Sequence, residues 1–457
     1  MKVMKILLIY PPFCTPASPS YSITNLFSFL KNNLPDKHKT DVIDLNISFH
    51  RKKFPDYWEY CKSLSKNYDF EKYEKTAENY RRETHEIYSE NNKKVLSGSK
   101  PELFYELLDE ILEKKPDIAA FSIVFSSQAF YAYALIEELK KNGIKTIVGG
   151  PSVSEMLKNA ADKSLKNEIE LLEYISGKKC DYESLKCETV LDFSAYRLSD
   201  YFTPKPMIPI KTSNTCYYKQ CTFCTHHEKI DYREFSLKNI KKTIIKSKQK
   251  NFLFIDDMIH TKRLLEISKM LKPLKVSWMC QLRPTKDFDL KTLKIMYDSG
   301  LKIIYWGIES ASDRILGLIG KGTNKKSISK VLKDSHDAGI KNGAYIMFGF
   351  PTETKEEFIE TIDFLKNNSA NIDIVSTAIF GLQKGSKIYE NPSKFGISEI
   401  IEEKRTVLDP KISYKSSEGI TQEEANMLRK KFKKSIENIN KYPKMMNFFR
   451  EHMISVI

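Results

Sequence analysis

The alternation of short apolar segments with amphipathic ones constrains the fold of this chain more than any other feature. From residue 208 onward, six apolar segments are separated by stretches of helical periodicity, such as SLKNIKKTIIKSKQK and KEEFIETIDFLKNN. The predicted strands cover 208–213, 251–257, 275–281, 301–310, 341–350 and 372–382. Repeated strand and helix steps make a parallel sheet, so we expect a partial (β/α)6 barrel of the TIM type, whose chemistry gathers at the carboxyl ends of the strands.

A shorter alternation of the same kind occupies the first third of the chain. Its predicted strands are 5–10, 41–46, 117–124 and 145–148, and a helix is predicted at 128–142. A charged stretch rich in Tyr and Lys, about 51–112, interrupts the alternation and is expected to be a helical insertion. We therefore expect an α/β protein that begins with a doubly wound, Rossmann-like domain, with a ligand at the carboxyl ends of its strands.

The length of 457 residues exceeds what one hydrophobic core usually supports, so more than one domain is expected. We divide the chain into a Rossmann-like domain at 1–155, a linker at 156–204, a partial barrel at 205–395 and a small helical segment at 396–457.

Composition narrows the classes of function. Eight cysteines in a chain of this length, five of them scattered, do not make the dense framework of a small secreted domain. The net charge of +15 comes from lysines spread along the whole chain, which is typical of a solvated basic surface rather than a nucleic-acid site. No stretch approaches the roughly 18 apolar residues of a membrane span. We expect a cytoplasmic protein that binds neither membranes nor nucleic acid.

Three cysteines lie within nine positions after the first barrel strand. Cys216, Cys221 and Cys224 are followed, after Thr225, by His226 and His227. A zinc site would take four ligands from this set. Three thiolates without a fourth cysteine nearby instead suit a 4Fe-4S cluster with one open iron. Both interpretations rest on the same residues at this point.

Polar residues and glycines follow the other barrel strands. They are Asp256, Asp257, Gln281, Arg283, Glu309, Ser310, Gly349, Glu353, Gln383 and Lys384. Because parallel strands end at the same edge of a barrel, we expect these residues and the cysteines to surround one site.

These segments together resemble the radical S-adenosylmethionine (SAM) superfamily, and in particular its members with a cobalamin-binding type of N-terminal domain. The motifs that carry the resemblance are PIKTSNTCYYKQCTFC, FLFIDDMI, YWGIESASDRIL, KGT, GFPTET and FGLQKGSKIYENPSKFGI. The resemblance covers nearly the whole chain. It implies a 4Fe-4S cluster and SAM as cofactors, with cobalamin as a third candidate.

The resemblance also implies roles for single residues. Cys216, Cys221 and Cys224 would bind three irons of the cluster. The implied SAM contacts are Phe223, Asp256, Asp257, Arg283, Glu309, Ser310, Gly349 and Glu353. For Asp257, Ser310 and Glu353, a role in capping a loop is an equal alternative. The candidate cobalamin contacts are Ser122, Gly149, Gly150 and Pro151 in the N-terminal domain.

The chain departs from the superfamily pattern in two places. Four residues, rather than three, separate the first two cysteines, a spacing that a subgroup with an aromatic pair such as Tyr217-Tyr218 shares. No strand is evident after GGP at 149–151, and no Asp-x-His-x-x-Gly motif is present to supply a histidine to cobalt. The missing strand predicts that the corrinoid site is trimmed or lost, whereas the missing motif does not exclude cobalamin.

The expected function is cleavage of SAM to functionalise an unactivated carbon, by cobalamin-assisted methyl transfer to a peptide or natural product. A radical SAM enzyme without cobalamin, catalysing cyclisation, cross-linking or rearrangement, is one alternative. A zinc-containing nucleic-acid-binding protein is the alternative of another class. If the protein is a radical SAM enzyme, a flavodoxin or ferredoxin is the expected electron donor.

Overall fold

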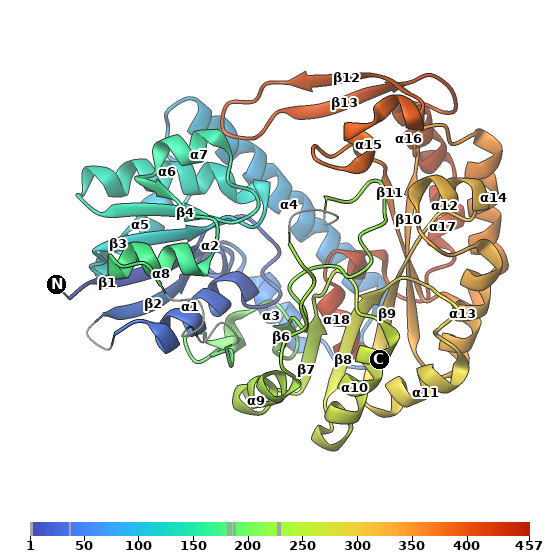
Figure 1. The fold of residues 1–457 in the computed structure, drawn as a ribbon, viewed down its shortest axis with the longest axis horizontal. Helices are drawn as coiled ribbons and strands as arrows, with labels where there is room; N and C mark the ends of the chain where they lie inside the picture. The colour runs from blue at the N-terminus through green and yellow to red at the C-terminus, as the bar shows by residue number, and fades with distance from the viewer. Residues whose placement is uncertain (1–2, 36–37, 181–184, 186–188, 226–229) are drawn as a thin grey trace.

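The computed structural model describes residues 3–35, 38–180, 185, 189–225 and 230–457. Two parallel sheets lie side by side, a five-stranded sheet near the N-terminus and a six-stranded sheet in the second half (Figure 1). The expected α/β class, with a Rossmann-like domain followed by a partial barrel, is confirmed. No helix of the described residues is both long and apolar enough to cross a membrane.

The first sheet has the strand order β2-β1-β3-β4-β5, and all its pairings are parallel. Its strands are β1 (Lys5–Tyr10), β2 (Lys39–Asp44), β3 (Ile118–Ser122), β4 (Lys145–Gly149) and β5 (Lys163–Ser164). The chain order reverses between β1 and β3, so the loops that follow these two strands flank the switch point where doubly wound folds bind ligands.

Helices cover both faces of the first sheet. One face carries α1 (Tyr21–Asn33) and α8 (Glu168–Ser176), and the other carries α5 (Phe104–Glu113), α6 (Ala129–Lys141) and α7 (Glu155–Ala160). The alternation of β1 explains this division, because Ile6 and Leu8 pack under α1 whereas Leu7 and Ile9 pack under α6.

The strand that the sequence did not reveal after GGP is present but very short. β5 has two residues and pairs with Ile147 and Val148 of β4. Lys163 and Ser164 are both exposed polar residues, so no apolar pattern marks this strand in the sequence.

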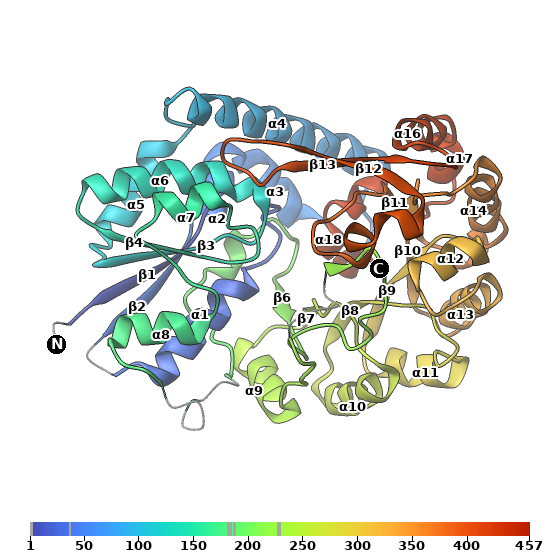
Figure 2. The ribbon, with the colours of Figure 1, turned by 45° about the horizontal axis from the view of Figure 1, so that its top comes forward.

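The stretch between β2 and β3, which includes the expected insertion, is helical. The segment contains α2 (Leu45–Lys53), α3 (Pro55–Ser63), α4 (Phe70–Leu96) and α5. The long helix α4 runs beside both sheets (Figure 2). Tyr73 and Tyr80 lie seven residues apart on one face of α4, and their hydroxyl groups meet the Nδ1 atoms of His452 and His50. The insertion thereby joins the N-terminal domain to the C-terminal end of the chain.

The second sheet is the predicted six-stranded partial barrel, in the order β11-β10-β9-β8-β7-β6. Its strands are β6 (Met207–Ile210), β7 (Asn251–Phe254), β8 (Ser277–Leu282), β9 (Leu301–Glu309), β10 (Lys341–Phe348) and β11 (Ile374–Ile379). Each overlaps its predicted range. The outer helices are α9 (Leu237–Ser247), α10 (Thr261–Leu271), α11 (Leu290–Asp298), α12 (Asp313–Ile319), α13 (Lys325–Asp337) and α14 (Lys355–Asn367).

The C-terminal segment is not purely helical, which corrects the sequence prediction for 396–457. After the short α15 (Lys387–Glu390), strands β12 (Ile397–Glu403) and β13 (Lys411–Ser416) form an antiparallel hairpin. The hairpin crosses from the barrel toward the first sheet (Figure 2), and Ser154 donates a 2.6 Å hydrogen bond to the Val407 carbonyl at its far end. Most hairpin residues stay partly or fully exposed, so no buried apolar stripe marks the strands in the sequence.

The chain ends in α16 (Gln422–Lys431), α17 (Lys433–Glu437) and α18 (Arg450–Val456). Helix α18 lies on the inner face of the barrel sheet, on the side of the N-terminal domain (Figure 1). Met453 of α18 packs with Met279, Ile303 and Ile374, which point inward from three different strands. The lower part of the inner face is therefore filled by the chain's own C-terminus.

Candidate active site at the barrel mouth

The three cysteines lie on the loop that follows β6. All three are free thiols and half-buried. Asp256, at the end of β7, holds the base of this loop, because its carboxylate accepts hydrogen bonds from the backbone N–H and hydroxyl groups of Thr212 and Ser213, at 2.8 to 3.0 Å. Asp256 is 1% exposed, and burial raises the pKa of its carboxyl group to about 6 although these hydrogen bonds lower it.

The far side of the cysteine loop is held by the segment after α12. The backbone N–H of Thr222 donates to the Ile319 carbonyl at 2.8 Å. Tyr218 donates from its hydroxyl to the Gly320 carbonyl at 2.9 Å. The loop is thus tied to two different βα units of the barrel, which fixes the cysteines at its mouth.

Arg283, from the end of β8, lies flat against Tyr218. Its guanidinium carbon is 3.4 Å from the centroid of the Tyr218 ring, and its Nη1 donates to the Lys321 carbonyl at 2.8 Å. Gly322 permits this packing, because a Cβ there would lie 2.2 Å from the Tyr218 hydroxyl oxygen, and its φ of +64° suits glycine. The KGT motif therefore serves as a backbone platform under the cysteine loop.

A buried ion pair lies beside the cysteines. The Lys321 amino group is 2.8 Å from Oε1 of Glu309, the last residue of β9, and Lys321 is only 6% exposed. Burial raises the pKa of the Cys221 thiol, while the charges of Lys321 and Arg283 lower it. Lys321 and Arg283 thus oppose the effect of burial and of the Glu309 and Cys216 charges, and favour the thiolate form that binds iron.

Lys321 was not among the predicted site residues, although its KGT motif was. A lysine directly after a short amphipathic helix is usually expected to be a solvent-exposed residue at the helix end. The signal that was available is its position next to Gly322 and Thr323, in a loop rather than on a helix face.

Three predicted SAM contacts are engaged within the protein. Ser310 is fully buried and bonds to Thr361 and to the Ser312 backbone. Glu353 is fully buried and accepts a 2.5 Å hydrogen bond from Gly349 N–H, and burial raises its pKa to about 8. Together with Asp256, these residues hold loops at the strand ends. For Ser310 and Glu353 the loop-capping alternative fits the structure better, and Asp256 takes the same role.

Of the remaining predicted SAM contacts, four are half-buried at the barrel mouth, Phe223, Asp257, Arg283 and Glu309, whereas Gly349 is buried. Phe223 packs against the apolar cluster that contains Met347 and Phe350. Gly349 has a φ of +73° and accepts a 3.0 Å hydrogen bond from the Tyr414 hydroxyl of the hairpin.

The cysteine loop fits an iron-sulfur cluster better than a single zinc ion. Among the described residues, no three His, Cys, Asp or Glu side chains come together closely enough to hold one metal ion. A 4Fe-4S cluster takes each thiolate on a different iron, so its cysteines need not converge on one point. His226 and His227, the candidate fourth zinc ligands, lie outside the described residues.

The candidate cobalamin contacts lie at the carboxyl edge of the first sheet. Ser122 is buried and its hydroxyl group bonds to Ser22 at 2.8 Å. A Cβ at Gly149 would lie 2.9 Å from the Leu165 carbonyl, and one at Gly150 only 2.3 Å from the Ile123 carbonyl. Gly150 and Pro151 are exposed. The two glycines thus permit close packing of neighbouring loops, and only Gly150 and Pro151 present an open surface.

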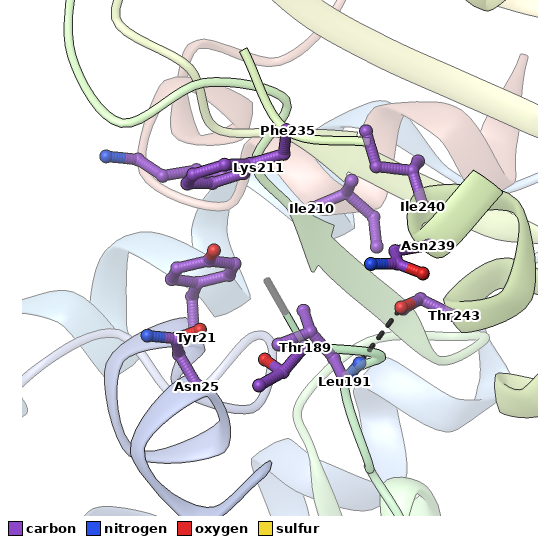
Figure 3. Close-up of a pocket in the computed structure, with 10 residues that line it drawn as sticks. All are labelled: Tyr21, Asn25, Thr189, Leu191, Ile210, Lys211, Phe235, Asn239, Ile240 and Thr243. Atoms are coloured by element: carbon purple, nitrogen blue, oxygen red, sulfur yellow. Dashed lines mark hydrogen bonds between the residues drawn. The ribbon is translucent and has the colours of Figure 1, made fainter. Parts of the chain in front are cut away.

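A small cavity lies where α1, the linker and α9 meet (Figure 3). The ring of Tyr21 and the side chains of Asn25 and Asn239 surround it, and Thr243 accepts a 2.9 Å hydrogen bond from Leu191 N–H at its wall. Its volume of about 40 Å³ is that of a few waters, each needing roughly 10–15 Å³. This cavity is too small for a cofactor.

Known proteins agree with this geometry. Residues 210–365 match the family model described as the Radical SAM superfamily. An uncharacterized methyltransferase of Pyrococcus horikoshii is 26% identical, over 94% of this chain and 92% of its own. Bacteriochlorophyllide d C-8(2)-methyltransferase of Chlorobaculum tepidum is 24% identical, over 60% of this chain and 68% of its own.

Solved structures share the fold over most of the chain. The cobalamin-dependent SAM radical enzyme OxsB, with aqua-cobalamin bound, has a TM-score of 0.63 at 16% identity and covers 94% of this chain and 67% of its own. The radical SAM methyltransferase TsrM from Kitasatospora setae, with cobalamin and a [4Fe-4S] cluster bound, has a TM-score of 0.60 at 12% identity, over 90% and 83%. Residues 210–365, which carry the cysteine loop at the mouth of the partial barrel, thus match the radical SAM superfamily, whose cofactors are a 4Fe-4S cluster and SAM.

Proposed function

We propose that this protein is a cobalamin-dependent radical SAM C-methyltransferase acting on a peptide or a natural product. The observation that carries the proposal is the joint arrangement of two sites. A cysteine loop lies at the mouth of the barrel, and a Rossmann-like sheet with a β1/β3 switch point lies beside it (Figure 1). The relatives with the longest matched segments described above are methyltransferases, and OxsB and TsrM bind cobalamin.

In this proposal the chain's own residues hold the cluster and orient SAM. Cys216, Cys221 and Cys224 bind three irons, and Asp256 keeps their loop in place. When bound, the cluster supplies the electron that cleaves the sulfonium of SAM. Lys321 and Glu309, a neutral pair on the inner face, lie where the polar part of SAM would meet the barrel.

Phe223 has a separate role in the proposal. It is half-buried against an apolar cluster that includes Phe350 and Phe380. This surface suits a flat aromatic ring, so we assign the adenine of SAM to it. The hairpin residue Tyr414 packs on the same cluster, and it limits access of water to this side of the mouth.

Cobalamin would lie between the exposed edge of the first sheet and the barrel mouth. Gly150 and Pro151 offer backbone surface at that edge, and the loops after β1 and β3 flank it. No lower ligand to cobalt is proposed from this chain, because its sequence has no Asp-x-His-x-x-Gly motif.

A specific observation favours the second candidate, a radical SAM enzyme without cobalamin. Strand β5 has only two residues, and Ser122 and Gly149 are engaged within the sheet edge rather than open to a ligand. Such an enzyme would use the same barrel for cyclisation, cross-linking or rearrangement.

The electron donor is proposed to be an acidic flavodoxin or ferredoxin. The net charge of +15 favours association with an acidic protein, and this attraction weakens as salt is added.

The test is anaerobic reconstitution with iron, sulfide and hydroxocobalamin, followed by gel filtration and an absorption spectrum of the protein fraction. A corrinoid band that elutes with the protein near one equivalent, together with a 4Fe-4S spectrum, supports the methyltransferase. A 4Fe-4S spectrum without corrinoid selects the second candidate. Stoichiometric zinc without sulfide would contradict both.

A further inference from the structure

Arg450 places a positive charge inside the barrel, well below the cysteine loop. Its Nη1 donates a 2.9 Å hydrogen bond to the Tyr345 hydroxyl of β10, and its guanidinium carbon lies 5.8 Å from the Tyr305 ring centroid of β9. Tyr305 is four residues before Glu309 on the same strand. Tyr345 pairs with Gly307, the glycine beneath the Lys321–Glu309 pair, so the guanidinium lies on the lower side of that pair.

The backbone that carries Arg450 is held rigidly. His452 donates from Nε2 to the Phe202 carbonyl at 2.6 Å and accepts at Nδ1 from the Tyr73 hydroxyl at 2.8 Å. The Phe449 ring stacks on His452, with centroids 4.6 Å apart. Met453 receives a 3.2 Å hydrogen bond from the Tyr305 hydroxyl. The guanidinium is therefore positioned in advance, so little order has to be gained when a ligand binds.

The charge of Arg450 has no counter-ion in the part of the chain that the structure describes. No carboxylate there lies within 4 Å of its guanidinium, although Glu451, the next residue, acts on it electrostatically. By contrast, Lys321 is neutralised by Glu309 at 2.8 Å. Arg450 is thus a partly buried cation that the protein itself leaves unpaired, an arrangement that costs stability unless an anion arrives.

The guanidinium also keeps free donors in accessible space. Only its bond to Tyr345 is formed with described residues, and the Arg450 side chain is half-buried rather than fully buried. Neighbouring positions of the inner face are open as well. Gly307, Tyr345 and Ser376 are half-buried and Ala378 is exposed. A ligand in the upper barrel can therefore reach Arg450.

We propose that Arg450, with the Tyr345 hydroxyl, binds a carboxylate of the substrate, which makes the substrate of this enzyme an organic acid. The inference rests on the proposed function, because it assumes a substrate inside the barrel. A planar guanidinium matches a carboxylate with two parallel hydrogen bonds, and a hydroxyl beside it adds a third donor. The carboxylate would hold the acid at the bottom of the open part of the barrel, with the rest of the molecule directed toward the cluster.

The carboxylate of SAM is a poorer match for Arg450. The charged groups that act on Cys221 are Lys321, Glu309 and Arg283, and these belong to the strand ends. Arg450 instead acts on Tyr305 and Tyr345, and of the three strand-end charges only Glu309 also acts on Tyr345. SAM bound to the cluster would meet the first group of charges, and Arg450 remains for the substrate.

The test measures binding without turnover, on the anaerobically reconstituted protein with SAM. The probes are 3-phenylpropionate and its uncharged amide, titrated by isothermal calorimetry. We expect the acid to bind at least tenfold more tightly than the amide in the wild type. Arg450→Gln should abolish this preference and Arg450→Lys should retain part of it. Arg429→Gln, on the outer helix α16, is the matched control and should behave as the wild type.

Two further readouts separate this inference from its rivals. SAM affinity and 5′-deoxyadenosine formation should stay within threefold of the wild type in Arg450→Gln, whereas a tenfold loss of SAM affinity would assign Arg450 to SAM and overturn the proposal. Equal binding of acid and amide to the wild type would overturn it too. Failure of the wild type to cleave SAM would instead contradict the proposed function.

A purely structural role for Arg450 predicts a marked decrease in the melting temperature of Arg450→Gln, whereas the proposal does not. Removing an unpaired cation should leave the melting temperature of Arg450→Gln unchanged or higher, and a marked decrease would contradict the proposal. Should that variant fail to fold, Tyr345→Phe keeps the charge and removes one hydroxyl. It should weaken binding of the acid about three- to tenfold and leave binding of the amide unchanged, and unaltered binding of the acid would overturn the proposal.

Discussion

The amino group of Lys321 lies 2.8 Å from the Glu309 carboxylate, and both lie directly over Gly307. A Cβ at Gly307 would be 2.9 Å from the lysine nitrogen and 3.1 Å from the glutamate oxygen, so the pair needs a glycine beneath it. Lys321 comes from the loop after α12 and Glu309 from the end of β9. The pair therefore joins the platform of the cysteine loop to the inner face of the barrel.

Lys321→Gln should lower both the stability of the protein and its SAM cleavage, while cluster assembly is retained. It leaves Glu309 without its cation in a largely buried place, and we expect the free energy of unfolding to fall by about 3 kcal/mol. Cluster assembly should survive, since the cysteines are not changed, but SAM cleavage should fall at least tenfold. Iron content and 5′-deoxyadenosine formation measure the two effects.

The matched control for this prediction is Lys325→Gln. Lys325 pairs with Glu360 at the same 2.8 Å distance, but both side chains are well exposed. Its loss should cost less than about 1 kcal/mol and leave SAM cleavage unchanged. Equal effects of the two substitutions would show that the buried pair has no special role at the site.

Asp256→Asn should disrupt the cysteine loop without touching a cysteine. The carboxylate accepts from Thr212 and Ser213, and an asparagine would turn an N–H group toward these donors. We expect a loss of about 3 kcal/mol in unfolding free energy, since two or more buried donors lose their acceptor, and less than half of the wild-type iron after reconstitution. Asp257→Asn, at the neighbouring half-buried position, is the control and should retain full iron content. Wild-type iron content in Asp256→Asn would contradict the assigned role.

The sequence predicted the features that depend on repeated local patterns. The six barrel strands were predicted within a few residues because each is an apolar run between amphipathic helices, and the cysteine loop was predicted because three thiols lie close together in the chain. Lys321 and Arg450 were not predicted. Their importance depends on partners far away in sequence, Glu309 for one and Tyr345 for the other, and no local pattern reports such contacts.

The lack of a local sequence pattern also explains where the predicted and observed folds differ. β5 and the β12–β13 hairpin have few buried residues, so they carry no strong period-two pattern. Asp256 could be placed at a strand end from the sequence. Whether its carboxylate faces a ligand or the backbone of Thr212 and Ser213 depends on how the next loop folds back, which only the structure reveals.

Gly322→Ala should damage the site through backbone geometry alone. The added methyl group would clash with the Tyr218 hydroxyl and the Arg283 guanidinium, and the residue has a φ of +64°. We expect a loss of about 2 kcal/mol or more in unfolding free energy, with weaker SAM cleavage. Gly317→Ala is the control in the neighbouring helix α12, where a Cβ meets nothing within 4 Å. That substitution should stabilise the protein by up to about 1 kcal/mol, because alanine favours a helix. Denaturant unfolding of both variants checks this prediction.

His452 should make the protein less stable as the pH falls from about 6.5 to about 4. Burial lowers its pKa from 6.5 to about 4, with Lys62 also opposing its charge, while the hydrogen bond to the Phe202 carbonyl acts in the other direction. In this window the unfolded chain binds a proton at His452 and the folded protein does not, so the contribution of His452 to stability is complete above pH 6.5 and is lost toward pH 4.

The measurement is the difference in unfolding free energy between the wild type and His452→Gln at a series of pH values. Glutamine can donate to Phe202 and accept from Tyr73 but does not titrate, and both proteins keep His50, so the difference isolates His452. We expect the wild type to lose about 3 kcal/mol relative to the variant between pH 6.5 and pH 4. His85→Gln, at an exposed position on α4, is the control for replacing a histidine by glutamine. A constant difference between the wild type and His452→Gln would mean that the ring is protonated in the folded protein, and the aromatic contact between α4 and α18 would then need a charged partner.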